Sequence, residues 1–349
     1  MGLKRKNLWM LIALLLAILT IRMIFVNSAE LTPEELLQTL KAASPIWLIT
    51  ALFCMVGFIW FEGKAILVIL EGIGQPRSAR QGFIYGASDI YFSAITPSAS
   101  GGQPASAYFM VKDGISHATT TAVLLLNLVM YTLAILSIAL VCMIGRFSLF
   151  LRFSMLSRLL IAAGFAALSG LVALFLLLLK KQRLIFGSCR RLIRFLAARK
   201  IVHHPEKYIE KLNHSQEEYA YCVKLMAGHS SMLRKAFFYN LIQRLCQFVL
   251  IISVYMAIGG SVSRIVELFV TQCYIILGSN FVPVPGSIGI TDYLMLDGYS
   301  HLFDTTMAYN LEMIGRSLSF YVCVLVSALA TLIAYLKVNH ASQKKEKAL

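Results

Sequence analysis

Two short polar segments interrupt an otherwise apolar chain, and the residue types in the first are suited to binding an anion. ITPSASGGQPASAYFM, residues 95–110, gathers serines, a threonine and a glutamine around two adjacent glycines. Pro97 and Pro104 each remove a backbone donor, and Gly101 and Gly102 permit positive φ angles, so the backbone should leave its helix here. Amides and hydroxyls freed in this way can bind phosphate or carboxylate oxygens, as can the positive end of a helix starting near Pro104.

The groups that could form this cradle are close together in the sequence. They are Thr96, Ser98, Ser100, Gly101, Gly102 and Gln103. An alternative is purely structural: the break could let two helices pack closely while serine and threonine side chains cap them. We predict a substrate site, because polar backbone inside a membrane is costly unless something satisfies it.

A second interruption, NFVPVPGSIGITD at 280–292, repeats this combination and adds a carboxylate. Pro285, Gly286 and Gly289 should break the helix, and Asp292 follows within one turn. An ionisable residue at membrane depth is a functional candidate by default.

Three further charged residues lie inside apolar stretches. Asp89 precedes the first break in YGASDIYF, Arg244 lies within FFYNLIQRLCQFVLII, and Arg316 follows the second break. Either arginine could pair with Asp89 or Asp292. Such a pair could hold the helix bundle closed or contact the substrate directly, and the sequence leaves both roles open.

Several kinds of chemistry lack their motifs. The chain has no G-x-x-x-x-G-K-[ST] loop, no G-x-S-x-G elbow and no H-E-x-x-H pair, so we expect no catalytic residue of these types and no cofactor. His203, His204 and His214 lack the spacing and carboxylate support of a metal site. The seven cysteines are scattered without a C-x-x-C pair, as expected for small core residues.

The elements that must position these residues are membrane helices. The chain has 349 residues, 58% of them hydrophobic, and its apolar runs at 8–21, 124–144 and 159–179 approach or reach the roughly 20 residues that span a bilayer. We therefore predict an all-α, polytopic bundle that forms one integral membrane domain over 1–349. The first 30 residues fit an uncleaved signal anchor better than a cleaved signal peptide, because the apolar stretch is long.

The distribution of charge sets the expected topology. Lys and Arg outnumber Asp and Glu by 32 to 17, and residues 180–235 hold 13 Lys and Arg against 4 Glu. Beside membrane spans, such a block indicates a cytoplasmic loop that lies against anionic headgroups. Within it, CRRLIRFLAARKIV at 189–202 has the pattern of an amphipathic interfacial helix. The N- and C-termini are then cytoplasmic.

Counting membrane crossings back from this loop leaves two segments that must return to the side they left. The segment 83–112 has to leave and re-enter the cytoplasmic side, and a 13-residue helix at 83–95 rises only about 20 Å. Residues 264–312 have to start and finish outside, before a closing helix at about 314–337. We therefore predict two broken re-entrant hairpins, and their opposite directions favour an inverted-repeat arrangement.

The two breaks resemble a known family. SAITPSASGGQPASAYFMVKDGI and PVPGSIGITD are similar to the paired motifs of the lysylphosphatidylglycerol synthase transmembrane, or flippase-like, family. The second motif of that family usually reads Pro-x-Pro-Gly-Gly-x-Gly-x-x-Glu. Here Ser287 replaces the second glycine and Asp292 replaces the glutamate.

The resemblance implies a role with lipids. Members of the multiple peptide resistance factor type join this membrane region to a cytosolic aminoacyltransferase domain, for which the chain, ending at Leu349, is expected to have no room. We therefore expect a flippase for (lysyl-)phosphatidylglycerol or a lipid-linked substrate, in a bacterial plasma membrane. The alternative is a phosphatidylglycerol lysyltransferase, which makes lysylphosphatidylglycerol and confers resistance to cationic peptides, or a membrane subunit of one. Expected partners are an anionic or aminoacylated phospholipid and the membrane, without nucleic acid; a homo-oligomer or a separate synthase partner stays open.

Overall fold

The computed structural model describes residues 41–198, 205–226, 229–280, 282 and 284–346, and this part of the chain is helical with no strand. The expected helix at 8–21 and the choice between signal anchor and signal peptide fall outside these residues. Six helical stretches of the described chain are long and apolar enough to cross a membrane. They are Pro45–Gly72, His117–Arg152, Met155–Leu177, Ser230–Ala257, Val262–Ser279 and Thr305–Val338.

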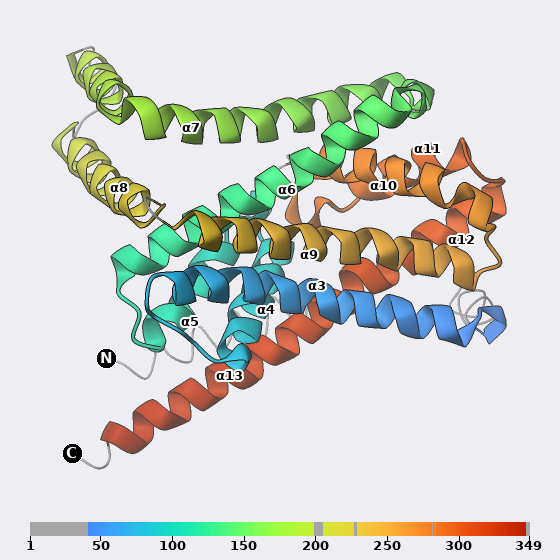
Figure 1. Cartoon of the computed structure of the whole chain (residues 1–349), viewed down its shortest axis with the longest axis horizontal. Helices are drawn as coiled ribbons and strands as arrows, with labels where there is room; N and C mark the ends of the chain where they lie inside the picture. Colours follow the sequence, from blue (N-terminus) through green and yellow to red (C-terminus); the bar gives the residue numbers. More distant parts are fainter. Residues whose placement is uncertain (1–40, 199–204, 227–228, 281, 283, 347–349) are drawn as a thin grey trace.

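Two antiparallel helices pack against each other and define the two ends of the bundle. Helices α3 (Pro45–Gly72) and α9 (Ser230–Ala257) lie side by side along their length (Figure 1). The Ser44 amide donates to the Ala257 carbonyl at 2.9 Å, and Gly72 packs against Met232 at the other end. We call the end with Gly72, α8 (Pro205–Met226) and the C-terminal turns of α13 (Cys323–Glu346) the basic end, and the opposite end the far end.

The first break forms a helical hairpin that opens toward the basic end. Helix α4 (Ala79–Ile95) starts with a capping box in which Ser78 and Gln81 bond reciprocally. After a 3₁₀ turn at Pro97–Ala99, α5 (Gly102–Lys112) runs back along α4. The Tyr85 hydroxyl in α4 donates to the carboxylate of Asp113, the C-cap residue of α5, at 2.5 Å. This bond holds the two antiparallel helices together.

The second break forms a hairpin that opens toward the far end. Helix α10 (Ile265–Ser279) runs inward and α11 (Ile290–Ser300) returns beside it. Gly278 packs against Leu294, Gly298 packs against Thr271, and the Tyr299 hydroxyl donates to Gln272 Oε1 at 2.7 Å. The sequence thus predicted both hairpins and their opposite directions; where they sit in a bilayer stays a prediction.

Glycines let α4 approach the backbone of α3. A Cβ atom at Gly63 would overlap the carbonyl oxygen of Gly82, and one at Gly86 would crowd the backbone of Gly63 and Ile59. Small residues permit such close packing between membrane helices. The approach has a direct consequence for the site, because Glu62 precedes Gly63 and Asp89 lies one turn after Gly86.

The tips of the two hairpins meet at the middle of the molecule. The turn at Pro285–Ser287 contacts both α4 and the turn at Pro97–Ala99, and Gly286 packs against Ala94. A long C-terminal helix passes this junction, made of α12 (Thr305–Arg316), a π-helical stretch at Ser317–Val322 and α13. This helix begins at Thr305, whereas the sequence predicted a helix at about 314–337. The additional first turns pack against α11 at the far end.

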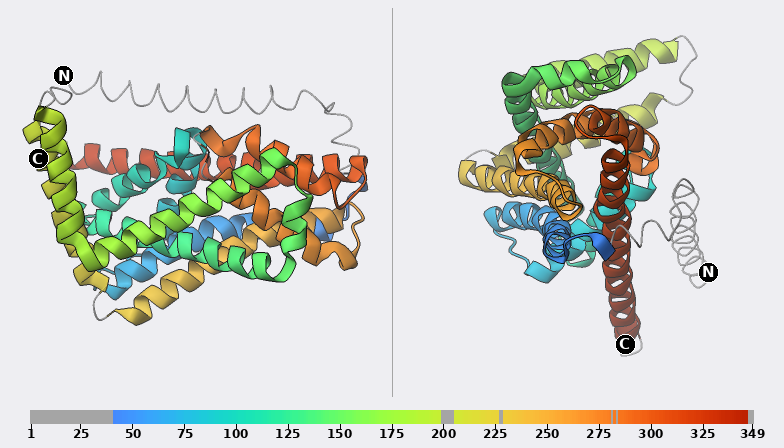
Figure 2. Two further views of the ribbon diagram at one scale, coloured as in Figure 1. Left: turned by 90° about the horizontal axis from the view of Figure 1, so that it is seen from above. Right: turned by 90° about the vertical axis from the view of Figure 1, so that its right-hand side faces the viewer.

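The remaining helices form one side of the bundle and the basic end. Helix α6 (His117–Arg152) kinks at Arg146 and leads into α7 (Met155–Ala198), whose apolar membrane stretch has only 17% of its residues buried. The part 189–198 of the amphipathic helix predicted at 189–202 continues α7, and its place at a membrane surface stays a prediction. It lies with α8 across the basic end (Figure 2), where Arg190 donates to Asn213 Oδ1 at 2.9 Å. Residues 199–204 are outside the described chain.

Candidate functional site

A cavity of about 650 Å³ lies where the two breaks meet helices α3, α6 and α9. Its wall includes Ser100 and Gln103 from the first break and Gly286 from the second, together with Arg244 and Arg316. Apolar side chains such as Phe58, Leu124 and Ile275 share the lining. The cavity is therefore amphipathic, with polar groups gathered around a space in the range of small-molecule sites.

A buried polar cluster forms the wall of the cavity at the middle of α3, α6 and α9. Glu62 is 4% exposed, and its two carboxylate oxygens accept hydrogen bonds from Asn127 Nδ2 at 2.7 Å and from Gln243 Nε2 at 2.6 Å. Asn240 Nδ2 donates in turn to Asn127 Oδ1 at 3.0 Å. These bonds lock the amide orientations, so that amide N–H groups point at the carboxylate.

Asp89 lies directly beside Glu62 rather than beside an arginine. The carboxyl groups of Asp89 and Glu62 lie against each other in the cavity wall, and Ser93 Oγ donates to Asp89 Oδ1 at 3.4 Å. Gly102 packs onto the same carboxylate, and a Cβ atom there would overlap Asp89 Oδ1 and Ser93 Oγ. The N-terminal turn of α5, which follows the first break, therefore packs directly against the Asp89 side chain.

Arg244 is held in the cavity wall largely by aromatic rings. Its guanidinium carbon lies 4.2 Å from the ring centre of Tyr131 and 5.0 Å from that of Phe58. Its Nη1 donates to Gln247 Oε1 at 2.8 Å, and its Nη2 donates to Gln243 Oε1 at 3.4 Å. Its Nε has no hydrogen-bond partner among the described residues, although the residue is 4% exposed. A buried cation with spare donor capacity is suited to binding an anion.

Arg316 joins the second break to the C-terminal helix. Its Nε lies 2.8 Å from Asp292 Oδ1, and its Nη2 donates to the Gly286 carbonyl at 2.9 Å. Its guanidinium carbon is 4.5 Å from the ring centre of Phe320. Arg316 lines the cavity wall, so Asp292 is linked to the cavity by its ion pair with Arg316.

Several predicted ligand groups in the two breaks are engaged within the breaks themselves. The Gly101 amide donates to Thr96 Oγ1 at 2.8 Å, and the Gly289 amide donates to Asp292 Oδ2 at 2.8 Å. The first bond holds the turn between α4 and α5, and the second caps the start of α11, which is the structural role considered for such residues. Pro285 begins the turn before Gly286, and the side chain of Ser98 is outside the described part. The structure thus brings Asp89, Ser100, Gln103, Gly286, Arg244 and Arg316 to one cavity wall.

Comparison with protein families shows a match over most of the chain. Residues 10–327 match the family described as "Lysylphosphatidylglycerol synthase TM region". The chain belongs to this family. A search of curated proteins found no match.

Within the lysylphosphatidylglycerol synthase TM family, this chain's two departures from the expected second motif have visible structural effects. Ser287 adopts φ +50°, a left-handed conformation that favours glycine. Its Oγ donates to the Ser279 carbonyl at 2.8 Å, and that bond ties the break to the end of α10. Asp292 is shorter than the glutamate of the expected motif, but its carboxylate still contacts both Arg316 and the Gly289 amide.

Sequence reasoning missed Glu62, which holds the centre of the polar cluster. The signal was present, because Glu62 is a carboxylate in the apolar stretch IWFEGKAILV and intramembrane acids are functional candidates. The two Pro- and Gly-containing breaks instead pointed to Asp89 and Asp292, which lie next to them in the sequence. The amide partners Asn127 and Gln243 carry no such signal, since only the fold places them beside Glu62.

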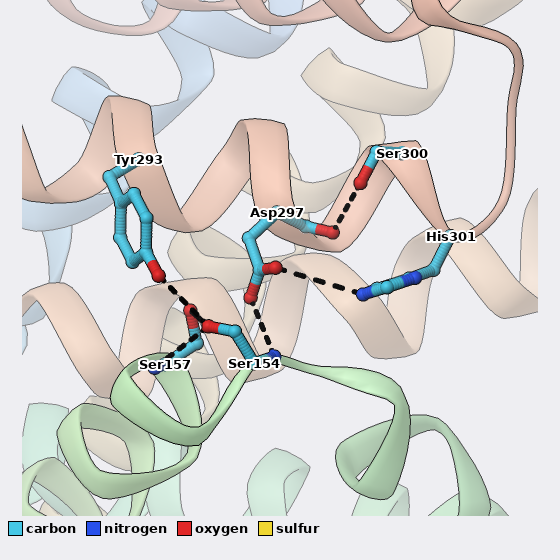
Figure 3. Close-up of polar contacts among 6 residues, drawn as sticks. All are labelled: Ser154, Ser157, Tyr293, Asp297, Ser300 and His301. Carbon is cyan, nitrogen blue, oxygen red and sulfur yellow. Dashed lines mark hydrogen bonds and ion pairs between the residues drawn. The ribbon is translucent and has the colours of Figure 1, made fainter.

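A second polar cluster at the far end lies outside the cavity lining (Figure 3). Asp297 on α11 accepts from the Ser154 amide at 3.0 Å, and its other carboxylate oxygen lies 3.7 Å from His301 Nε2. Ser154 Oγ is 2.9 Å from the Tyr293 hydroxyl and also bonds to Ser157. These contacts tie the α6–α7 junction to the second hairpin, so their role is to anchor it.

Proposed function

We propose that the protein moves a phospholipid with an anionic phosphate headgroup, such as (lysyl-)phosphatidylglycerol, or a lipid-linked substrate, between the leaflets of its membrane. The observation that carries the proposal is that both breaks and the two arginines line one cavity at the middle of the bundle. Membership of the lysylphosphatidylglycerol synthase TM family supports a role with membrane lipids.

The composition of the cavity wall favours a lipid over a wholly polar solute. Arg244 supplies a buried positive charge whose Nε lacks a hydrogen-bond partner within the described part of the chain, and Ser100 and Gln103 supply neutral hydrogen-bonding groups. The apolar part of the wall suits the glycerol and the first acyl carbons. A headgroup can enter such a space while the acyl chains remain in lipid, which lowers the cost of moving charge across the hydrocarbon core.

Opposed hairpins with touching tips provide a means of alternating access. One hairpin opens to the basic end and the other to the far end, and the cavity lies between their tips. In transporters with inverted repeats, substrates bind near the bilayer midplane where helices are discontinuous. Movement of either hairpin would then expose the headgroup to one side at a time.

The test is transbilayer movement of a labelled lipid in reconstituted vesicles. Fluorescent phosphatidylglycerol on the inner leaflet becomes accessible to an impermeant quencher only after it crosses, so the rate can be followed directly. We expect wild-type protein to accelerate this movement over empty vesicles. Failure to accelerate any anionic or aminoacylated phospholipid would overturn the proposal.

Arg244 gives the sharpest variant for this assay. Arg244→Gln keeps a hydrogen-bonding side chain and removes the charge, and we expect about a tenfold lower rate, the loss of roughly one charge-assisted hydrogen bond. Arg264→Gln is the matched control, because Arg264 is an exposed arginine paired with Glu267 away from the cavity. Equal rates for both variants would contradict headgroup binding at Arg244.

A second function is favoured by the word "synthase" in the family description. The same cavity could hold phosphatidylglycerol as the acceptor in a lysyl transfer, performed by this protein as a lysyltransferase or by a partner for which it is the membrane subunit. Purified protein incubated with lysyl-tRNA and phosphatidylglycerol tests the first version. Formation of lysylphosphatidylglycerol without a partner would establish transferase activity.

A further inference from the structure

The Glu62 and Asp89 carboxyl groups lie against each other in the cavity wall, where the backbones of α3 and α4 meet at Gly63 and Gly86. Two ionised carboxylates repel each other and carry no proton with which to bond, so this contact needs one proton between them. Both Glu62 oxygens already accept from the amides of Asn127 and Gln243. Glu62 is therefore the acceptor, and Asp89 is the group that donates the proton.

The hydrogen-bond donors around the Glu62–Asp89 pair favour binding of a proton over binding of a metal cation. Asn127 Nδ2 and Gln243 Nε2 both point N–H groups at Glu62, and Ser93 Oγ donates to Asp89. A metal ion needs lone pairs directed at it, and these amides would have to turn away. Rotation of Asn127 would also break its bond from Asn240, which makes that rearrangement unfavourable.

We propose that Glu62 and Asp89 form a proton-binding site that is coupled to the anionic headgroup at Arg244. The coupling rests on the proposed function, whereas the proton site stands on the geometry of the pair. With one proton bound, the pair carries one negative charge, which balances the single positive charge of Arg244. Loss of that proton adds a second negative charge beside Arg244 and opposes binding of an anion.

Proton binding and headgroup binding therefore strengthen each other. By linkage, an anion at Arg244 favours the protonated pair by the same factor by which the proton favours the anion. A proton and an anionic lipid would then bind the cavity together, so a proton gradient can drive the lipid in the direction in which protons flow. This assigns an energy source to the proposed movement.

The groups that face the pair come from each element packed around it. Arg244 from α9 and Tyr131 from α6 are the titratable neighbours with electrostatic contact to it. Helix α5 contributes Gly102, which has no side chain. The C-terminal helix adds Cys323 and Arg316 to the same cavity, and Arg316 is engaged by Asp292.

Infrared difference spectroscopy of the purified full-length protein tests the proton site without any lipid ligand. We expect a protonated carboxylic acid band at neutral pH in the wild type, and its loss in Asp89→Asn, whose amide can still donate to Glu62. Glu267→Gln is the control, because that acid pairs with the exposed Arg264 away from the cavity and should leave the band unchanged. A band that is absent from the wild type, or that persists in Asp89→Asn, would overturn the proton site.

The pH dependence of lipid movement tests the coupling. We expect the wild-type rate to fall by about fivefold or more as rising pH removes the band, in line with typical coupling energies. The rate of Asp89→Asn, whatever its size, should no longer change over that range. A wild-type rate that is independent of pH would overturn the coupling and leave the flippase proposal standing. No lipid movement at any pH would overturn that proposal and the coupling, while the infrared result still decides the proton site.

Discussion

Arg316 and Asp292 show how two charges can be retained in an apolar bundle. The side chain of Arg316 is 9% exposed and that of Asp292 is 26% exposed, and the second contacts of the pair go to the backbone of Gly286 and Gly289. The pair therefore fixes both ends of the second break. Its cost of desolvation is offset only while both partners are present.

Removal of one partner should be far more damaging here than in an exposed pair. We expect Asp292→Ala to destabilise the protein by about 3 kcal/mol, because it leaves the Arg316 guanidinium buried and unpaired. Glu267→Ala leaves Arg264, whose side chain is 48% exposed, in contact with solvent, so this substitution should cost less than about 1 kcal/mol. Thermal unfolding of the purified variants in one detergent measures both, and similar losses for the two would contradict this account.

Ser287 gives a second residue-level prediction. Its φ of +50° costs about 1 kcal/mol relative to glycine, and its bond to the Ser279 carbonyl returns a similar amount. Ser287→Gly loses the bond and the strain together, so its stability should stay near that of the wild type. Ser287→Ala loses only the bond and should be less stable than Ser287→Gly by about 1 kcal/mol. A higher melting temperature for Ser287→Gly than for Ser287→Ala would confirm this prediction, and the reverse order would contradict it.

The close contact of α3 and α4 is the packing feature on which the polar cluster depends. Because Gly63 and Gly86 carry no side chain, the two backbones meet and place Glu62 against Asp89. The helix interior loses some stability to each glycine, and the interface recovers it through packing. Close approach is therefore what converts two separate acids into one site.

Adding a single methyl group should separate these helices. We expect Gly63→Ala to destabilise the protein by about 1–3 kcal/mol, since its Cβ would overlap the Gly82 carbonyl oxygen. Gly170→Ala is the matched control in α7, where a Cβ meets nothing within 4 Å, and it should be neutral or stabilising by up to about 1 kcal/mol. Thermal unfolding compares them. The infrared band assigned to the Glu62–Asp89 pair should also be lost in Gly63→Ala alone.

The local elements were more predictable from the sequence than the site. Pro97, Pro104 and the glycines beside them mark the first break by backbone chemistry alone, and the distribution of charge requires the chain to turn back there. Which polar atoms remain available was not predictable. Thr96 caps the Gly101 amide, and the Glu62–Asn127 bond joins positions 65 residues apart, so both depend on how the helices pack.

For the molecule as a whole, the tips of the two opposed hairpins meet at one polar cavity. Apolar clusters lie on both sides of that cavity, one with Phe153 and Tyr299 toward the far end and one with Tyr85 and Met110 toward the basic end. These clusters can remain packed while the hairpin tips shift against each other. The arrangement suits movement about the cavity without loss of the core.

The orientation of the whole molecule in its membrane is the last prediction. The basic end carries the cationic ends of α7 and α8, and Lys and Arg are enriched on cytoplasmic sides. In a cysteine-free background, we expect an impermeant thiol reagent to label Ser263→Cys at the far end in intact cells. It should label Ser78→Cys at the basic end only after the membrane is opened, and both positions are exposed. The opposite pattern would reverse the orientation, and with it the side from which each hairpin admits a headgroup.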